Sequence, residues 1–322
     1  MNQPIDEFSL ISNYFKELTD QQDVTVGIGD DAAIINTKAD KQIAVATDTL
    51  VASVHFPDDA TAEQIATRAL CVNLSDMAAM GATPKWFTLS LTLPKQLACA
   101  DWLQGFSQGL ANLADRYNVS LIGGDTTAGP LSISITVLGE TPIGHSLCRN
   151  GAKPDDIIYV SGTLGDGAAA LHQLQHQDLA QNDRLTARFY QPQPQIELGL
   201  GLVSYASACI DISDGLVADL SHLCKASCVS ASINSQLLPV HSDIEQAYPE
   251  QSRQWALTGG DDYQLCFTVP SVNQADFERW ARSRSFDVTA IGKMAAIDHN
   301  QNYLKIDNQA LSIKVGGYAH FR

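Results

Sequence analysis

The sequence has few basic residues. Its 322 residues include 20 lysines and arginines against 36 aspartates and glutamates, which gives a formal net charge of −16 at pH 7. Nucleic-acid binding depends on basic contacts to phosphates, and anionic membrane surfaces attract basic segments. The shortage of positive charge therefore predicts a protein that binds neither nucleic acid nor a membrane surface.

Long apolar runs and a secretion signal are also missing. No stretch stays apolar over the roughly 20 residues that a membrane-spanning helix needs, and the start, MNQPIDEFSL, has no basic region followed by an apolar segment. The seven cysteines are scattered without a CxxC pair, which is typical of reduced thiols. Cys224 and Cys228 lie near His222, but small buried thiols on a helix explain this spacing better than a metal site does. We expect a cytoplasmic protein.

Motifs of the common nucleotide-binding classes are absent or unconvincing. The sequence contains no GxxxxGK[ST] loop, no HRD with DFG, and no GxSxG. The string GIGDDA at 27–32 formally matches a dinucleotide-binding pattern, with Asp48 about twenty residues further on. However, Asp30 and Asp31 would then occupy the place of the pyrophosphate, and the residues that follow predict a hairpin instead of the required helix. The string does not indicate a Rossmann site.

The chain does have an alternation of helix and strand patterns along its length. Thr61 and Gln64 form a capping box, which predicts a helix that ends near Gly81. Segments 86–93, 119–124 and 131–139 are typical of strands, and 101–117 is typical of a helix. The length predicts two domains, and KPDD at 153–156 marks a boundary. We expect an N-terminal domain with a mixed sheet over 1–150 and a C-terminal α/β or α+β domain over 151–322.

Aspartates gather where predicted strands end, often after glycine. One such aspartate usually caps a turn or a helix, but several clusters of the same short carboxylate favour a hard cation such as Mg²⁺. Mg²⁺ would also reconcile an acidic protein with an anionic phosphate ligand. The candidates are Asp30 and Asp31 in GIGDDAA, Thr47 and Asp48 in IAVATD, Asp76 in NLSDMAAM, Asp125 after LIGG, Asp211 and Asp214 in IDISDGL, and Asp261 and Asp262 after LTGG.

A set of strings, taken in order, resembles the bacterial thiamine-monophosphate kinase family: GIGDDAA, ATDTLVASVHF, NLSDMAAMGATP, LIGGDTTAGP, SGTLGDGAAAL, IDISDGL and GGDDYQLCF. The resemblance covers the whole chain, including the closing GYAHF. It implies the two-domain α/β (α+β) fold shared with aminoimidazole ribonucleotide synthetase, with an N-terminal domain that forms a homodimer. It also implies transfer of the γ-phosphoryl group of ATP to thiamine phosphate, with several Mg²⁺ ions. The products would be ADP and thiamine diphosphate, in the last step of thiamine diphosphate biosynthesis.

The resemblance also implies roles for individual residues. The Mg²⁺ ligands would be Asp30, Thr47, Asp48, Asp76, Asp125, Asp211 and Asp214, of which Asp30, Asp48, Asp76 and Asp214 are the expected catalytic residues. The ATP contacts would be Gly124, Asp125, Arg149 and Ser213. The contacts to thiamine phosphate would be His55, Asp261 and Tyr318.

The substrate positions depart from the family pattern. The family usually reads GGEDYEL where this sequence has GGDDYQL, so Asp261 and Gln264 both stand in place of glutamate. Tyr318 stands where the closing motif often has tryptophan. A carboxylate that is shorter by one methylene, and a smaller ring, keep the chemical type of each contact but loosen its geometry.

Other interpretations stay open at this point. Arg149 could be a solvated loop residue, His55 a structural histidine, and Ser213 the N-cap of the helix that follows it. The chain could also be another enzyme of the same fold. A selenophosphate synthetase would have a cysteine or selenocysteine and a lysine in a glycine-rich N-terminal loop, but residues 1–30 contain no cysteine. A hydrogenase-maturation protein would end in cysteine, whereas this sequence ends in His320-Phe321-Arg322. Aminoimidazole ribonucleotide synthetase would share ATP binding, but it matches the SDMAAMGA and GGDTT strings less well. A third interpretation is a non-catalytic protein that binds Mg²⁺ or nucleotide.

Overall fold

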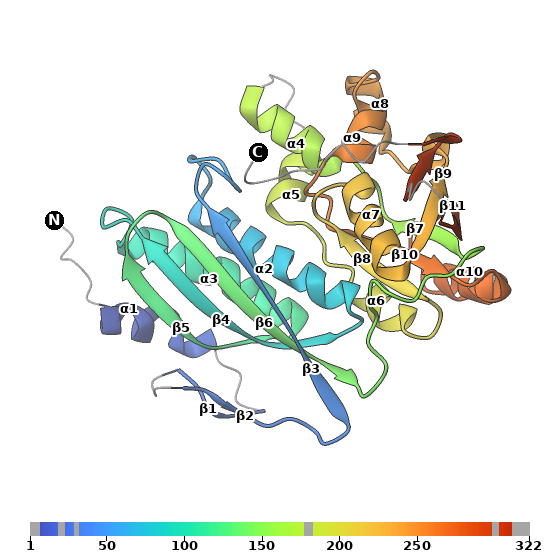
Figure 1. The fold of residues 1–322 in the computed structure, drawn as a ribbon. Coiled ribbons are helices and arrows are strands. Elements are labelled where there is room, and N and C mark those ends of the chain that lie inside the picture. The colour runs from blue at the N-terminus through green and yellow to red at the C-terminus, as the bar shows by residue number, and fades with distance from the viewer. Residues whose placement is uncertain (1–6, 19–22, 29–31, 177–182, 298–302, 311–322) are drawn as a thin grey trace. The chain divides into compact units, whose positions relative to one another are not determined.

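The computed structural model describes residues 7–18, 23–28, 32–176, 183–297 and 303–310. Contacts divide the chain into two compact units, which are coloured along the chain in Figure 1. The first unit comprises residues 1–77 and 82–144, and the second comprises 78–81 and 145–322. Among the described residues, none of the helices has the length and the apolar character needed to cross a membrane.

The first unit is built on a four-stranded sheet with the strand order β3-β6-β4-β5. β3 (Lys41–Val51) pairs antiparallel with β6 (Ser132–Pro142), and β6 pairs antiparallel with β4 (Thr83–Leu93). β5 (Ser120–Ala128) runs parallel to β4, and α3 (Ala100–Tyr117) connects the two. The sheet is therefore mixed, as the sequence predicts.

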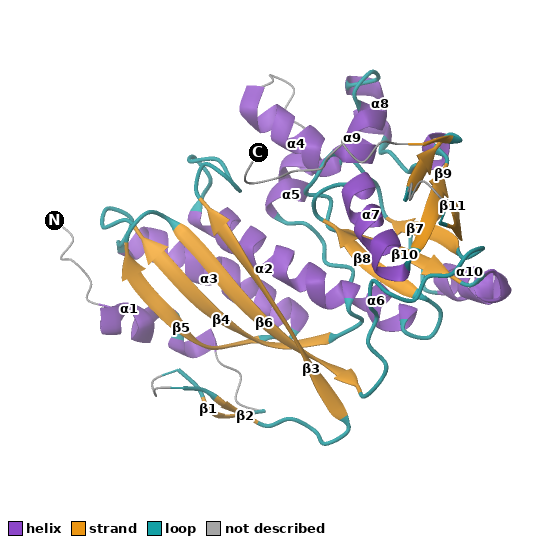
Figure 2. Ribbon diagram, in the orientation of Figure 1, coloured by secondary structure: helices purple, strands orange, loops and turns teal. Residues whose placement is uncertain are grey.

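Helices cover one face of this sheet (Figure 2). α2 (Ala62–Ala79) begins at the predicted capping box, because Thr61 N donates to Gln64 Oε1 at 2.9 Å and Gln64 N donates to Thr61 Oγ1 at 3.2 Å. α1 (Glu7–Tyr14) and the short helix η1 (Lys16–Leu18) flank Phe15, whose ring lies edge-on to that of Phe106 in α3. These contacts fasten the N-terminal segment to the helical layer.

A two-stranded ribbon precedes the sheet in sequence. β1 (Val24–Val26) and β2 (Ile34–Ile35) pair antiparallel, and Val24 packs with Trp86 and Ile122 of the main sheet. The described residues after GIGDDA therefore form a strand and not the helix of a dinucleotide site. The predicted hairpin of these residues is wrong, because β2 pairs with β1, which precedes GIGDDA, while β3 pairs with β6. Asp30 and Asp31 lie outside the described residues.

The second unit contains a seven-stranded sheet with the order β13-β12-β9-β11-β7-β10-β8. Its strands are β7 (Ile157–Ser161), β8 (Ala208–Ile212), β9 (Val229–Ile233), β10 (Gln264–Val269), β11 (Val288–Ala296), β12 (Leu304–Ile306) and β13 (Gln309–Ala310). In the described part of the sheet only β9 and β12 pair in parallel. β10 runs between β7 and β8 and antiparallel to both, so the ends of β7 and β8 lie beside the start of β10.

Helices pack on this sheet around two apolar cores. One core joins Leu220 and Leu223 of α7 to Ile210 of the sheet, and the other joins Tyr159 and Phe267 to helices α6 and α10. The helices are α4 (Asp166–His176), α5 (Asp183–Tyr190), α6 (Ile196–Leu202), α7 (Leu216–Ser227), α8 (Ser242–Ala247), α9 (Ser252–Thr258) and α10 (Gln274–Ser283), with short helices η2 (Ser235–Leu237) and η3 (Ser271–Asn273). Cys224 is buried in the first core, as predicted for a small thiol on a helix, whereas the prediction is wrong for Cys228, which is exposed and follows the end of α7.

Candidate active site

In the first unit, α2 positions two of the predicted aspartates. Asn73, fully buried in α2, accepts a hydrogen bond from Asp48 N at 3.0 Å and donates to Ala69 O at 2.9 Å. Asp76 follows Asn73 by three residues and so lies one turn further along the same helix face. α2 therefore holds the main chain at Asp48 and carries Asp76 one turn further along. Burial raises the pKa of the Asp48 carboxyl above its ordinary value, as expected for a carboxylate withdrawn from water.

The same helix holds the loop that carries His55. Arg68, which is only 2% exposed, donates from Nε to His55 O at 3.0 Å. Val51 N donates to His55 Nδ1 at 3.0 Å. A neutral imidazole that accepts at Nδ1 carries its proton on Nε2. The fold thus fixes the tautomer in which His55 presents an N–H donor.

The other predicted residues of the first unit lie on a different part of the sheet. Asp125 is in the same row as Thr49, because β5, β4, β6 and β3 pair in register through Ser90 and Ser134. Thr47 shares that face, whereas Asp48 points to the opposite one. β3 and β5 are the two outer strands, so Asp125 lies about 14 Å, three strand spacings, from β3. The structure therefore does not bring Asp125 to Asp48. A side chain at Gly124 would collide with the β4 backbone, so only glycine fits beside Asp125.

In the second unit, three glycine-containing turns meet at one end of the sheet. They are 162–167 after β7, 213–215 after β8 and 259–263 before β10. Asp261 N donates to Ser213 O at 2.9 Å, and Tyr263 N donates to Ile212 O at 2.8 Å. Asp214 is the next residue of the same turn. The structure thus brings Ser213, Asp214 and Asp261 together.

Glycine is what allows these turns to pack so closely. A Cβ on Gly260 would lie 2.6 Å from Ser213 O, and a Cβ on Gly167 would lie 2.6 Å from the carbonyl oxygens of Gly260 and Asp261. Real side chains do not approach backbone atoms to this distance, so a larger residue at either position would force the turns apart. The glycines are spatial requirements of the site and not only of the local turns.

Asp219 is a residue of this region that the motifs did not single out. Its Oδ2 atom accepts hydrogen bonds from the N–H groups of Ser213, Asp214 and Gly215, each at 3.1 Å. The N-cap of α7 is Gly215, without a side-chain cap, so the interpretation of Ser213 as the N-cap is wrong. The only signal in the sequence is an aspartate in the first turn of a helix.

Three carboxylates crowd around this turn. Burial, followed by the charges of Asp211 and Asp214, raises the pKa of Asp219 to about 8. Asp211 is itself only 6% exposed. Such crowding of like charges is relieved by a proton on Asp219, which its raised pKa favours, or by a cation. Carboxylate oxygens are the hard donors that Mg²⁺ takes, so the donor set of this turn fits that ion.

Within the described residues, no group of three or more His, Cys, Asp or Glu side chains is arranged to hold a metal ion by itself. This does not conflict with the chemistry of Mg²⁺, which usually keeps several waters and takes only one or two carboxylates together with substrate phosphates. Asp30, one of the predicted ligands, lies outside the described residues, as does Tyr318. Their roles stay predictions.

The loop of Arg149 is fastened to the end of α7. Ser227 Oγ donates to Arg149 O at 2.9 Å and accepts from the N–H groups of Gly151 and Ala152, both at 3.1 Å. The pKa of His222 in α7 is lowered by burial and then by the nearby charges of Lys225 and Arg149. The exposed Arg149 guanidinium therefore lies near α7, the helix that begins at the Asp214 turn.

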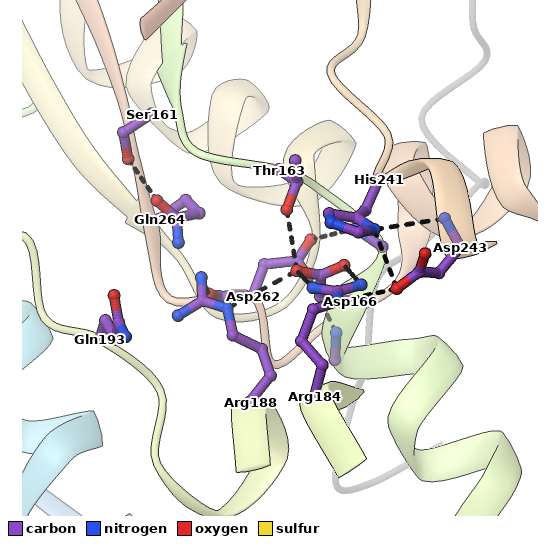
Figure 3. A network of polar contacts seen from close by, with 12 residues as sticks. Ser161, Thr163, Asp166, Arg184, Arg188, Gln193, His241, Asp243, Asp262 and Gln264 are labelled. Atoms are coloured by element: carbon purple, nitrogen blue, oxygen red, sulfur yellow. Dashed lines mark hydrogen bonds and ion pairs between the residues drawn. The ribbon is translucent and has the colours of Figure 1, made fainter. Parts of the chain in front are cut away.

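Asp262, the neighbour of Asp261, ties two of the three turns together (Figure 3). It is 1% exposed, and its carboxylate accepts from Gly165 N at 2.7 Å and from Gly167 N at 3.0 Å. Asp261 and Tyr263 have φ angles of 68° and 49°, a left-handed conformation that costs free energy in residues other than glycine. The Asp262 bonds hold the turn in this conformation. Burial raises the pKa of Asp262 to about 7.

The rest of the network in Figure 3 surrounds Asp166 and Gln264. Arg184 donates to both oxygens of Asp166, at 2.9 and 3.2 Å. Gln264 is 2% exposed, and its side-chain amide lies 2.6 Å from Ser161 Oγ. The departure from the family pattern at Gln264 therefore lies in a buried contact between β10 and β7.

Two family models match this chain. AIR synthase related protein, N-terminal domain, matches residues 29–141, and AIR synthase related protein, C-terminal domain, matches residues 153–304. Together with the two mixed α/β units, these matches define the class: a two-domain protein of the AIR synthase related fold. The predicted fold is confirmed.

Individual relatives narrow the class. The thiamine-monophosphate kinase of Escherichia coli (strain K12) is 44% identical over 321 residues, which is 98% of each chain. The crystal structure of the thiamine-monophosphate kinase from Stenotrophomonas maltophilia K279a superposes with a TM-score of 0.86 at 40% identity, covering 97% of this chain and 99% of that one. The structure of AaThiL complexed with AMPPCP and TMP superposes with a TM-score of 0.79 at 33% identity, covering 98% and 97%. This chain belongs to the thiamine-monophosphate kinase family.

The raised pKa of Asp262 predicts a pH dependence of stability. The folded protein holds the Asp262 proton up to about pH 7, whereas the unfolded chain releases it near pH 4. The stability that this group contributes is therefore fully present below about pH 4 and is lost as the pH rises towards 7. We expect the free energy of unfolding of the wild type, relative to Asp262→Asn, to fall by about 2–4 kcal/mol over this range.

Urea denaturation at several pH values measures this difference. Asp276→Asn, at an exposed aspartate, serves as the control and should give a constant difference from the wild type. A difference between wild type and Asp262→Asn that does not change with pH would contradict the assignment.

Proposed function

We propose that this protein transfers the γ-phosphoryl group of ATP to thiamine phosphate, forming thiamine diphosphate and ADP. The observation that carries the proposal is similarity over nearly the whole chain to thiamine-monophosphate kinases, one of which is complexed with AMPPCP and TMP. AMPPCP is an analogue of ATP, and TMP corresponds to the acceptor. As in the relatives, the reaction would be a phosphotransfer to a phosphate group.

The nucleophile of this reaction needs no general base. It is an oxygen of a phosphate monoester, whose second pKa is near 6, as in other monoesters, so it is already anionic at neutral pH. Phosphoryl transfer then depends on positioning and on neutralising charge. A site rich in carboxylates that can hold cations, with His55 fixed as a donor, is consistent with this demand.

We assign Asp48 and Asp76 in the first unit, and Asp211 and Asp214 in the second, as residues that hold Mg²⁺, with Asp30 as a further ligand. Thr47 and Asp125 would bind a different ion, because they lie on the sheet face opposite to the Asp48 side chain. When bound, Mg²⁺ neutralises the phosphates and polarises them as a Lewis acid. The buried Asn73 orients Asp48, and the 213–215 turn orients Asp214. The number of ions and the order of binding stay open.

We assign Gly124, Asp125, Arg149 and Ser213 as contacts to ATP. Arg149 would place a positive charge beside the phosphates. The Ser227 bonds fix the main chain of its loop at the C-terminal end of α7. His55, Asp261 and Tyr318 would bind thiamine phosphate, with the Nε2–H group of His55 as a donor to its phosphate. Tyr263 donates to Asp261 Oδ1 at 3.2 Å, which supports a defined orientation of the shorter carboxylate.

We further propose that the first unit forms a homodimer through β3 and its sheet. On the sheet face opposite α2, β3 exposes Val45 (60%) and Ile43 (36%) beside Thr47, whose Oγ1 lies 2.8 Å from Thr136 Oγ1. β3 is also an outer strand of 11 residues, and long outer strands are usually covered. A second copy of the chain would cover this face. The cytoplasmic location stays a prediction from the sequence.

The reaction is tested by ³¹P NMR of the purified protein with ATP, Mg²⁺ and thiamine phosphate. We expect the signals of ADP and the paired phosphate signals of thiamine diphosphate to appear together. Melting temperatures with and without Mg²⁺ and ATP are recorded in parallel. Stabilisation by these ligands without turnover would instead support a binding protein without catalytic activity.

Asp76→Asn tests the assignment of the metal ligands. We expect turnover at limiting Mg²⁺ to fall by at least about tenfold, a loss typical of disturbed metal sites, with an unchanged melting temperature in the absence of ligands. Glu63→Gln removes a carboxylate from an exposed position of the same helix and should leave turnover unchanged. Wild-type turnover of Asp76→Asn at limiting Mg²⁺ would rule out Asp76 as a ligand.

Val45→Glu tests the dimer, because it places a charge on the face that the second copy would cover. Sedimentation at micromolar concentration should give a dimer for the wild type and a monomer for the variant. Val272→Glu, at a valine of the second unit that is 87% exposed, should remain dimeric. If the Val45→Glu variant stays dimeric, the dimer interface does not use this face of the sheet. If the wild type is monomeric, the protein does not form the proposed homodimer.

A further inference from the structure

The turn between β8 and α7 is held from both sides of its backbone. On one side, the N–H groups of residues 213–215 all donate to Asp219 Oδ2. On the other side, the carbonyl of Ser213 accepts the N–H of Asp261, and the carbonyl of Ile212 accepts the N–H of Tyr263. The peptide groups of the turn therefore have few alternative orientations while Asp219 is in place.

Asp219 also occupies the place where the start of α7 could receive an anion. Side chains in the first turn of a helix point back towards its N-terminus, and the free N–H groups there commonly bind phosphate. The N–H groups of Ser213 and Asp214, just before the helix, and of its N-cap Gly215 are directed at the carboxylate of Asp219, which is only 4% exposed. A phosphate of ATP could use them only by displacing Asp219. Within residues 213–215, the side chains and not the N–H groups are therefore left to meet ATP and its cations.

We propose that Asp219 is a positioning residue for ATP and the Mg²⁺ ions that accompany it. By fixing the backbone of residues 213–215, it fixes the directions in which the Ser213 and Asp214 side chains leave the main chain, next to Asp211 at the end of β8. This inference rests on the proposed function, because it takes these three residues as the groups that meet ATP and Mg²⁺. Asp219 acts through them, since its Oδ2 is committed to the three N–H groups.

The hydrogen-bond geometry predicts which substitutions the turn tolerates. Asn keeps an oxygen of the same reach that can accept the three bonds, although it removes the charge. Glu keeps the charge but moves the oxygens by about one bond length, 1.5 Å, which breaks the arrangement. Ala removes every bond. A positioning role therefore predicts that Asp219→Asn preserves the site, whereas Asp219→Glu and Asp219→Ala disturb it.

Calorimetric titration with AMPPCP and Mg²⁺ measures this without turnover. We expect Asp219→Ala and Asp219→Glu to weaken binding by at least about tenfold, as for residues that orient metal ligands. Asp219→Asn should stay within about threefold of the wild type, because the hydrogen bonds are retained. If Asp219→Ala does not fold, the comparison of Glu with Asn still decides the question.

Asp156→Ala is the matched control. Asp156 is also 4% exposed, and it accepts bonds from Lys153 N at 2.9 Å and Ser207 Oγ at 2.6 Å, outside the 213–215 turn. It should lower the melting temperature but leave AMPPCP affinity unchanged. An equal loss of affinity in Asp156→Ala, wild-type affinity in Asp219→Glu, or loss in Asp219→Asn as large as in Asp219→Glu would each overturn the proposal.

Failure of the proposed function gives a different result. A wild-type protein that binds AMPPCP with Mg²⁺ but forms no thiamine diphosphate would refute the acceptor and leave the role of Asp219 to the calorimetric comparison. If the wild type makes thiamine diphosphate but the Asp219 variants bind AMPPCP as tightly as the wild type, only the role of Asp219 is refuted.

Discussion

Buried carboxylates that accept backbone N–H groups hold the second unit's candidate site together. Asp219 gathers the N–H groups of the turn after β8, and Asp262 gathers those of the turn after β7. A buried carboxylate is costly unless such bonds satisfy it, so each of them requires its turn to keep its shape. The close packing of Gly167, Gly260 and Ser213 depends on this, because at these positions the turns meet backbone against backbone.

In the first unit, a neutral and a cationic side chain fix the backbone of the candidate site residues. The Asn73 amide holds the main chain at Asp48, and the Arg68 guanidinium holds the carbonyl of His55. Both belong to α2, so a single helix sets the position of residues on β3 and on the loop that follows it. The orienting residues Arg68, Asn73, Asp219 and Asp262 are all buried, whereas His55, Asp125 and Asp214 are exposed or half-buried.

Much of this could be predicted from local sequence. The capping box at Thr61, the mixed sheet of the first unit and the gathering of Ser213, Asp214 and Asp261 all follow from residues close together in the chain or from recognisable strings. The partner of the strand after Gly29 could not be predicted in this way, because β2 pairs with β1 and not with β3. Asn73, Ser227, Asp219 and Asp262 could not be assigned their roles in this way. Their partners are backbone groups, and every residue has such groups whatever its type. The partners are also distant in sequence: those of Ser227 lie 75 to 78 residues away, and those of Asp262 lie 95 to 97 residues away. Asp30 and Tyr318 lie outside the described residues, so their predicted roles are untested.

The left-handed backbone conformation of Asp261 bears on the departure from the family pattern, in which aspartate stands in place of glutamate. Aspartate and asparagine adopt positive φ more readily than longer side chains, because their short polar groups interact with the adjacent backbone. At a φ of 68°, aspartate therefore carries a smaller conformational cost than the glutamate usual in the family. At position 261, aspartate therefore reaches one methylene less far into the site than glutamate would, but it adopts the left-handed main-chain conformation at a lower free-energy cost.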